Sequence, residues 1–108
     1  MELLFKSGSS HLSYPIKLVV LETPTALLYP AQAMFVAPKR SFKKSPDRNV
    51  LKRRMREAYR LNKSVLYETL HVKNKKLILA FIYTGKKIGD YAQIELAILN
   101  LIKILTKD

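Results

Sequence analysis

The chain has 108 residues, a length that fits a single domain and leaves no room for a second hydrophobic core. Hydrophobic residues make up 48% of it, which is typical of a folded protein, and the lack of cysteine excludes a disulfide scaffold, a thiol nucleophile and a cysteine-ligated zinc site. Twenty Lys and Arg against eight Asp and Glu give a net charge of +12, which favours a polyanionic partner, either nucleic acid or an acidic membrane surface.

Nothing in the hydropathy predicts a membrane protein. The longest apolar stretches, 18–21 and 77–83, are far shorter than the roughly 20 residues that a membrane span needs. The first five residues lack the basic leader and long apolar run of a secretory signal. The default expectation is a cytoplasmic protein without a membrane partner.

The first half of the chain is predicted to be mainly strands. Residues 1–6 are predicted to be a short helix that Gly8 stops, and its abrupt start suggests that the front of a longer helix is missing. Residues 14–23 alternate as a strand, and residues 31–37 form another that runs into a proline. Between them, residues 25–29 are either a further strand or an irregular connection.

The second half is predicted to contain two helices around a buried strand. Ser45 can cap a helix, Pro46 suits its first turn, and the helix runs to about Leu61, with residues 65–70 either continuing it or starting a new turn. Residues 77–83 are apolar on both faces, which predicts a central strand. After a loop over 85–89, Asp90 with a glutamine three residues later resembles a capping box for the last helix. The order is therefore αβ(β)βαβα, a sheet covered by helices.

The positive charge is concentrated in one segment. Residues 39–60 carry ten basic and two acidic residues, a net +8 in 22 residues, and every arginine lies between 40 and 60. The guanidinium group suits paired contacts with phosphate and stacking on bases, so this clustering favours nucleic-acid binding over a merely solvated helix face.

A helical projection at about 100° per residue separates a basic face from an apolar one. Leu51, Met55 and Ala58 face one way. Tyr59 falls at the border of the basic arc, as either packing or a stacking platform. Arg54 falls between the apolar residues, at the flank of the helix, as either a snorkelling residue or a contact. Glu57 is expected to form a local ion pair. The arc of roughly 140° contains, besides Tyr59, these residues: Arg48, Asn49, Lys52, Arg53, Arg56 and Arg60.

No constellation in the sequence supports protein-based catalysis. No carboxylate pair has a positioned base, the two histidines have no spaced ligand partners, and the three glycines are isolated, so no phosphate-binding loop is present. We therefore predict no catalytic residue and no metal ligand. From the residues alone the chain is an RNA- or DNA-binding module.

The stretch 47–60, DRNVLKRRMREAYR, resembles the signature helix of the bacterial ribonuclease P protein subunit. That family carries Arg-Asn-Arg, an aliphatic residue, then Lys-Arg and further basic residues. The resemblance extends to Lys39-Arg40, to residues 5–8 at the end of the first helix, and to the order of elements, so it covers essentially the whole chain as one RNA-binding domain, 1–108. Two departures are Val50 in place of the third residue of the triplet, and a first helix that in the family starts well before Met1.

The resemblance implies an α/β, or α+β, two-layer sandwich with a small mixed sheet and a left-handed βαβ crossover, an exception to the usual handedness. It implies a protein that assists a catalytic RNA in removing the 5′ leader of precursor tRNA, with magnesium serving the chemistry at the RNA active site. The partners implied are that RNA subunit and precursor tRNA, with no obligate protein partner.

The resemblance also implies two sets of binding residues. The leader would lie in a cleft between sheet and first helix, with Phe5 and, on strands, Lys17 and Phe35 as candidates; simple core packing is the alternative for both phenylalanines. The residues expected to face the RNA subunit are Lys39, Arg40, Lys43, Lys44, Arg48, Asn49, Lys52, Arg53, Arg56 and Arg60.

Two alternatives stay open at this point. One is a structural RNA-binding module, similar to a ribosomal protein and with no enzyme association. The other is a DNA-binding protein that uses residues 46–60 as a recognition helix, although the short helix that should precede one is missing.

Overall fold

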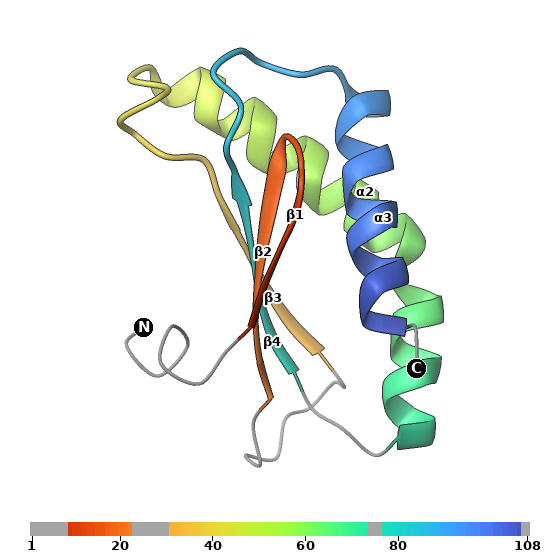
Figure 1. The fold of residues 1–108 in the computed structure, drawn as a ribbon. Helices are drawn as coiled ribbons and strands as arrows, with labels where there is room; N and C mark the ends of the chain where they lie inside the picture. The colour runs from red at the N-terminus through yellow and green to blue at the C-terminus, as the bar shows by residue number, and fades with distance from the viewer. Residues whose placement is uncertain (1–8, 23–30, 74–76, 107–108) are drawn as a thin grey trace.

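A computed structural model describes residues 9–22, 31–73 and 77–106 of the chain. A four-stranded sheet is covered on one face by two helices that lie alongside each other (Figure 1). The elements in chain order are β1 (Ser9–Ser13), β2 (Ile16–Glu22), β3 (Ala31–Val36), α2 (Ser45–Lys73), β4 (Leu77–Tyr83) and α3 (Tyr91–Thr106).

The sheet is mixed, with strand order β1-β2-β4-β3. β1 and β2 form an antiparallel hairpin, β2 and β4 are also antiparallel, and β3 runs parallel to β4. β4 is therefore interior, as its continuous apolar sequence predicts. The parallel pair is joined through α2, so the βαβ unit is present, and its left-handed sense stays a prediction of the family resemblance.

Strand alternation gives the sheet two different faces. On the helix side, Ile16, Leu18 and Val20 of β2 join the main hydrophobic core together with the buried faces of α2 and α3. On the other side, Val19 and Ala80 form a second, smaller cluster with half-buried aliphatic neighbours. The predicted division of the strand at residues 14–23 into two faces is confirmed.

Helix α2 is longer than predicted at both ends. The carbonyl of Lys44 accepts hydrogen bonds from the amides of Asp47 and Arg48, so Lys44 occupies the capping position and Ser45 is already inside the helix. At the other end the helix continues through the polar stretch 62–64 to Lys73, because Leu66 and Leu70 bury their side chains on the same face as the residues before them. Of the two possibilities for residues 65–70, continuation is confirmed.

Helix α3 agrees closely with the prediction. The carboxylate of Asp90 accepts a hydrogen bond from the amide of Gln93 at 2.9 Å, and its carbonyl accepts one from the amide of Ile94 at 3.1 Å. The first bond satisfies an amide that a helix start leaves unpaired, and the second is the first i→i−4 bond of the helix itself. Downstream, Ile98 and Leu101 are fully buried against the sheet and α2.

One strand was not predicted, and two predicted elements lie outside the described residues. β1 has the polar sequence SSHLS and lies at the edge of the sheet, so it lacks the apolar alternation that marks the other strands. The helix expected over 1–6 and the uncertain strand over 25–29 fall outside what the structure describes.

Candidate nucleic-acid interface

Three connections meet at one end of the sheet, and both helices begin there (Figure 1). β3 and β4 are parallel, so the segments that follow them, 37–44 and 84–90, leave the sheet at the same end. The β1–β2 turn, 14–15, lies there as well, because Ile16 is paired with Tyr83 at the end of β4. We call these three segments the loop end. The N-termini of α2 and α3 add partial positive charge to it, which favours anions.

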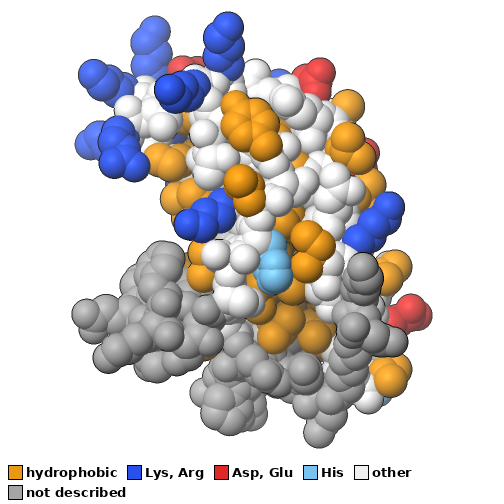
Figure 2. Space-filling view, viewed as in Figure 1, with side chains coloured by type: hydrophobic (Ala, Val, Ile, Leu, Met, Phe, Trp, Pro, Cys, Tyr) orange, Lys and Arg blue, Asp and Glu red, His pale blue; other side chains and the backbone are white. Residues whose placement is uncertain are grey.

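Positive side chains gather at the loop end. Figure 2 shows Lys and Arg side chains crowded at the upper left of the molecule, where the segment before α2 lies in Figure 1. The exposed cations of the loop end are Lys39, Arg40, Lys43, Lys44, Lys86 and Lys87.

The segment before α2 is fixed from inside. Phe42 is only 6% exposed and meets the ring of Tyr83 edge to face, with centroids 5.7 Å apart. The Arg48 guanidinium donates to the carbonyl of Phe42 at 2.8 Å, to that of Lys43 at 3.0 Å, and to the hydroxyl of Ser45 at 3.0 Å. These contacts hold the backbone in place while its four cations point to solvent. Arg48, predicted as an RNA contact, therefore has a structural role at this site.

The solvent face of α2 is rotated from the predicted arc. Asn49, Arg53 and Arg56 are exposed, whereas Lys52 is half-buried at the flank. Tyr59 is 6% exposed and packs against the core, so of its two alternatives packing is confirmed. The rotation occurs because the large ring of Tyr59 is buried more favourably than it is exposed.

Arg60, also predicted to face RNA, is paired within its own helix. Its guanidinium donates to both carboxylate oxygens of Glu57, at 3.0 and 2.7 Å, which confirms the expected ion pair. The hydrogen bond from Arg60 lowers the pKa of the Glu57 carboxyl, and the same bond raises the pKa of Arg60. Both side chains are exposed, so the pair adds little to stability.

The residues predicted for the leader cleft do not come together. Phe35 faces the helices, where it stacks on Phe81 with centroids 5.5 Å apart and meets Tyr59 at 5.8 Å. The guanidinium of Arg56 lies over its ring at 5.7 Å. Its role is therefore packing between sheet and α2, the alternative expected for an aromatic residue on an inward strand position.

Lys17 lies on the opposite face of the sheet. It is exposed and follows Ile16, whose side chain is in the main core, so the alternation of β2 turns Lys17 away from the helices. Its cross-strand partner Ile82 packs with the smaller cluster of Val19 and Ala80. Lys17 and Phe35 thus cannot line one cleft, and Phe5 is outside the described residues.

Sequence reasoning missed two cations and the role of a third. Lys86 and Lys87 are exposed at the loop end, but their position next to residues 39–44 follows only from the strand order. Arg54, predicted to lie between the apolar residues at the flank of the helix, donates to the carbonyl of Gly89 and so ties α2 to the loop before α3. A signal was available for the first pair: two adjacent lysines between glycines, directly after a buried strand.

Within the described ranges, no group of three or more His, Cys, Asp or Glu side chains could hold a metal ion. No helix among the described residues combines the length and the apolar character that crossing a membrane requires. The fold and the loop end together define a basic α+β protein with an extended surface for a polyanion.

Comparison with known proteins identifies the family. The family model for ribonuclease P matches residues 2–105 of this chain. The ribonuclease P protein components of two strains of Porphyromonas gingivalis are 33% identical to it over 95 residues, which is 87% of this chain and 69% of theirs. The chain belongs to the ribonuclease P protein family. It is accordingly a subunit of an endoribonuclease holoenzyme of tRNA processing, and it associates with the RNA subunit of that ribonucleoprotein.

Solved structures of the family have the same fold. The RNase P protein from Thermotoga maritima, in complex with 1-(4-fluorophenyl)-2-thiourea, is 25% identical and matches with a TM-score of 0.75 over 94% of this chain and 90% of that one. The Staphylococcus aureus RNase P protein is 18% identical and matches with a TM-score of 0.71 over 95% of this chain and 85% of that one, a likeness of fold. The predicted mixed sheet with helices on one side is confirmed.

Proposed function

We propose that this chain uses its loop end and the exposed face of α2 to bind the RNA subunit, and that it helps that RNA to remove the 5′ leader from precursor tRNA. The observation that carries the proposal is the convergence of cations from segments 37–44 and 84–90 beside the N-terminus of α2. Each phosphate that these cations neutralise releases counterions, which favours the approach of two polyanions.

The proposed RNA contacts divide into two groups. Exposed residues make the direct contacts: Lys39, Arg40, Lys43, Lys44, Asn49, Arg53 and Arg56. Of these, Arg56 also lies over the Phe35 ring. Arg48 acts mainly by fixing the segment before α2. Lys52 contacts RNA from the flank of the helix, and Arg60 contacts RNA only when its ion pair with Glu57 is broken. For the leader, the described candidate is Lys17, on the sheet face opposite the helices.

The chemistry is proposed to belong to the RNA. The magnesium expected of the holoenzyme is assigned to the RNA active site, and because no described cluster of side chains fits a metal, none is assigned to this chain. The protein contributes charge neutralisation and orientation of the substrate. The compartment in which this would take place is the cytoplasm.

Reconstitution tests this function directly. The chain is mixed with its cognate RNA subunit and end-labelled precursor tRNA at low magnesium, where charge neutralisation by the protein matters most, and the released leader is measured. We expect strong stimulation by the wild-type chain, weaker stimulation by Arg53→Ala and Arg56→Ala, and wild-type stimulation by Lys103→Ala, which removes an exposed charge from α3. Tight RNA binding without any stimulation would instead identify a structural RNA-binding module.

A further inference from the structure

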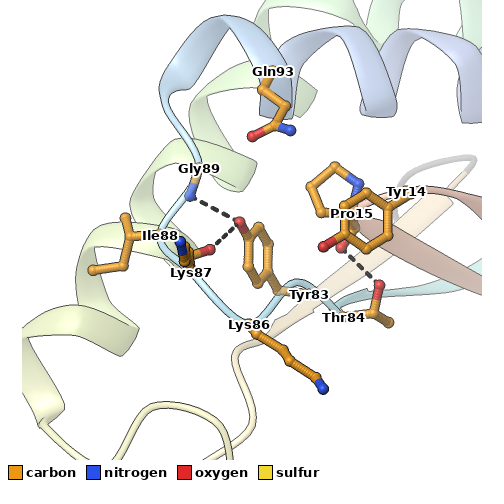
Figure 3. A pocket seen from close by; sticks show the side chains of 9 residues that line it. All are labelled: Tyr14, Pro15, Tyr83, Thr84, Lys86, Lys87, Ile88, Gly89 and Gln93. Carbon is orange, nitrogen blue, oxygen red and sulfur yellow. Dashed lines mark hydrogen bonds between the residues drawn. The ribbon is translucent and has the colours of Figure 1, made fainter.

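A cavity of about 450 Å³ opens at the loop end (Figure 3). Its volume lies within the range of roughly 300–1,000 Å³ that small-molecule sites occupy. The residues that line the cavity come from the β1–β2 turn, the end of β4, the segment 84–89 and α3, and not from α2. The β1–β2 turn forms one wall, through Tyr14 and Pro15, and the segment 84–89 forms the other. Gln93, in the first turns of α3, points toward the space between these walls (Figure 3).

The segment 84–89 is held rigidly from below. The buried hydroxyl of Tyr83 accepts a hydrogen bond from the amide of Gly89 at 2.8 Å and donates one to the carbonyl of Lys87 at 2.7 Å. Arg54 of α2 donates to the carbonyl of Gly89. The side chains of Lys86 and Lys87 are exposed at the rim. The wall is thus preformed, and the two cations are presented without a cost in ordering the backbone.

Both glycines of this wall are required by close packing. A methyl group built at Gly85 would come within 2.9 Å of the Tyr83 ring and 3.1 Å of the Pro15 side chain. One built at Gly89 would come within 2.8 Å of the Tyr83 hydroxyl. A side chain at either position would therefore push this wall of the cavity away from Tyr83.

The walls combine three kinds of group that single-stranded RNA sites use. Tyr14 is 67% exposed and offers a ring on which a base can stack. Gln93 supplies an amide for the edge of a base, and Lys86 and Lys87 supply charge for a phosphate. The nearby carboxylate of Asp90 accepts a hydrogen bond from the backbone amide of Gln93.

We propose that this cavity holds one unpaired ribonucleotide, with its base against Tyr14, its base edge at Gln93 and its phosphate at Lys86 and Lys87. This inference rests on the proposed function, because it deepens the contact with RNA. Both RNA partners contain unpaired nucleotides, so the source is either the RNA subunit or precursor tRNA. The excess of lysine at the rim favours RNA over an apolar peptide as the occupant.

The absence of tryptophan from the chain makes the stacking step directly measurable. In a Tyr14→Trp variant the only indole lies in the proposed site, and its fluorescence is quenched when a base stacks on it. The matched control is Val72→Trp, which places the indole at an 84% exposed position near the other end of α2. Each variant is titrated separately with the RNA subunit and with precursor tRNA.

We expect one of the two RNAs to quench the Tyr14→Trp variant and to leave the control unchanged, which also identifies the source. Tyr14→Ala should weaken the affinity for that RNA at least about fivefold, because stacking on an aromatic ring contributes that much per base, while Tyr14→Phe should keep it. In the Tyr14→Trp background, Lys86→Ala and Lys87→Ala should each shift the midpoint of the quenching titration to higher RNA concentration, and Lys103→Ala should not.

The outcomes separate this inference from the proposed function. If both RNAs bind the Tyr14→Trp variant by gel shift and neither changes its fluorescence, the nucleotide site is refuted, while leader removal by the wild-type holoenzyme still supports the function. Equal effects of Lys86→Ala, Lys87→Ala and Lys103→Ala would also refute it, because only net charge would then matter. If the wild-type chain gives no stimulation of cleavage, the proposed function fails, and the quenching result decides the cavity independently.

Discussion

Phe42 and Tyr83 meet edge to face, with ring centroids 5.7 Å apart, and this contact joins the segment before α2 to the end of β4. Neither ring carries charge, yet the pair fixes the relative positions of two cationic segments that are more than 40 residues apart in the chain. The geometry of the basic surface therefore depends on apolar packing beneath it.

Phe42→Ala should lower both stability and RNA affinity. The substitution leaves a cavity under the segment 37–44, which should reduce the free energy of unfolding by about 3 kcal/mol, as measured by urea denaturation. RNA affinity should fall as well, although the charge is unchanged, because the cations lose their fixed spacing. Phe42→Leu is the control and should retain most of both. An RNA affinity equal to that of the wild type, with the stability lost, would show that spacing is unimportant.

Arg48→Ala and Arg53→Ala should have different effects, although each removes one arginine from the same helix. Arg48 bonds the carbonyls of Phe42 and Lys43, so its loss should lower the free energy of unfolding by about 1 kcal/mol. Arg53 is exposed, and its loss should leave thermal unfolding unchanged while it weakens RNA binding. Calorimetry and filter binding on both variants measure the difference, and a matching stability loss in Arg53→Ala would contradict it.

The salt dependence of RNA binding should identify the residues that contact phosphate. Arg53→Ala and Arg56→Ala should each reduce the slope of log affinity against log salt by about 1. Arg48→Ala should weaken binding more than Lys103→Ala, which removes the same formal charge from α3. Slopes are measured between low and moderate potassium chloride. Identical slopes for all four variants would mean that the RNA senses only the total charge of the protein.

Tyr59→Phe should stabilise the protein and should reduce the decrease in its free energy of unfolding as the pH rises above neutral. The buried hydroxyl of Tyr59 has no hydrogen-bond partner among the described residues, so removing it should raise the free energy of unfolding by about 1 kcal/mol. Burial also raises the pKa of Tyr59. Above a pH of about 10 the unfolded chain therefore loses a proton that the folded chain keeps, and stability falls as pH rises.

The measurement is urea unfolding of wild type and Tyr59→Phe between neutral pH and mild alkali. The variant should keep part of the decline, because burial raises the pKa of Tyr83 and Tyr91 too. If the free energy of unfolding depends on pH in the same way for the two proteins, Tyr59 does not titrate differently in the folded and unfolded states. If Tyr59→Phe is markedly less stable at neutral pH, the hydroxyl of Tyr59 is hydrogen-bonded in the folded protein.

Much of the fold could be predicted because hydrophobic periodicity is a local property. β3, β4 and α3 appear within a residue or two of the predicted bounds, and the Asp90 cap forms the predicted hydrogen bond. β1 could not be predicted from SSHLS, because an exposed edge strand is held by hydrogen bonds to its neighbour and not by burial of its side chains. The end of α2 depended on Leu66 and Leu70 meeting a core that the sequence does not display.

The candidate site was predictable in composition but not in arrangement. The cations of segment 39–44 were evident from charge counting, whereas Lys86 and Lys87 joined them only through the pairing of β3 with β4. The roles of individual residues were also hidden: Arg48 and Arg60 have the same charge as Arg53, but they are bonded to nearby carbonyls and to Glu57. Alternation along a strand shows which residues share a face with Phe35 or Lys17. It does not show which of the two faces the helices cover.

The position of β4 in the sheet has a consequence for the order of folding. It is the last strand along the chain, yet it lies between β2 and β3. Of the pairings in the sheet, only the β1–β2 hairpin can form before residues 77–83 are inserted, and the pairs that β4 makes with β2 and β3 span long stretches of sequence. Such non-local closure slows folding. Assembly of the RNA-facing end is therefore a late event, completed only when a single apolar strand enters the gap between two others.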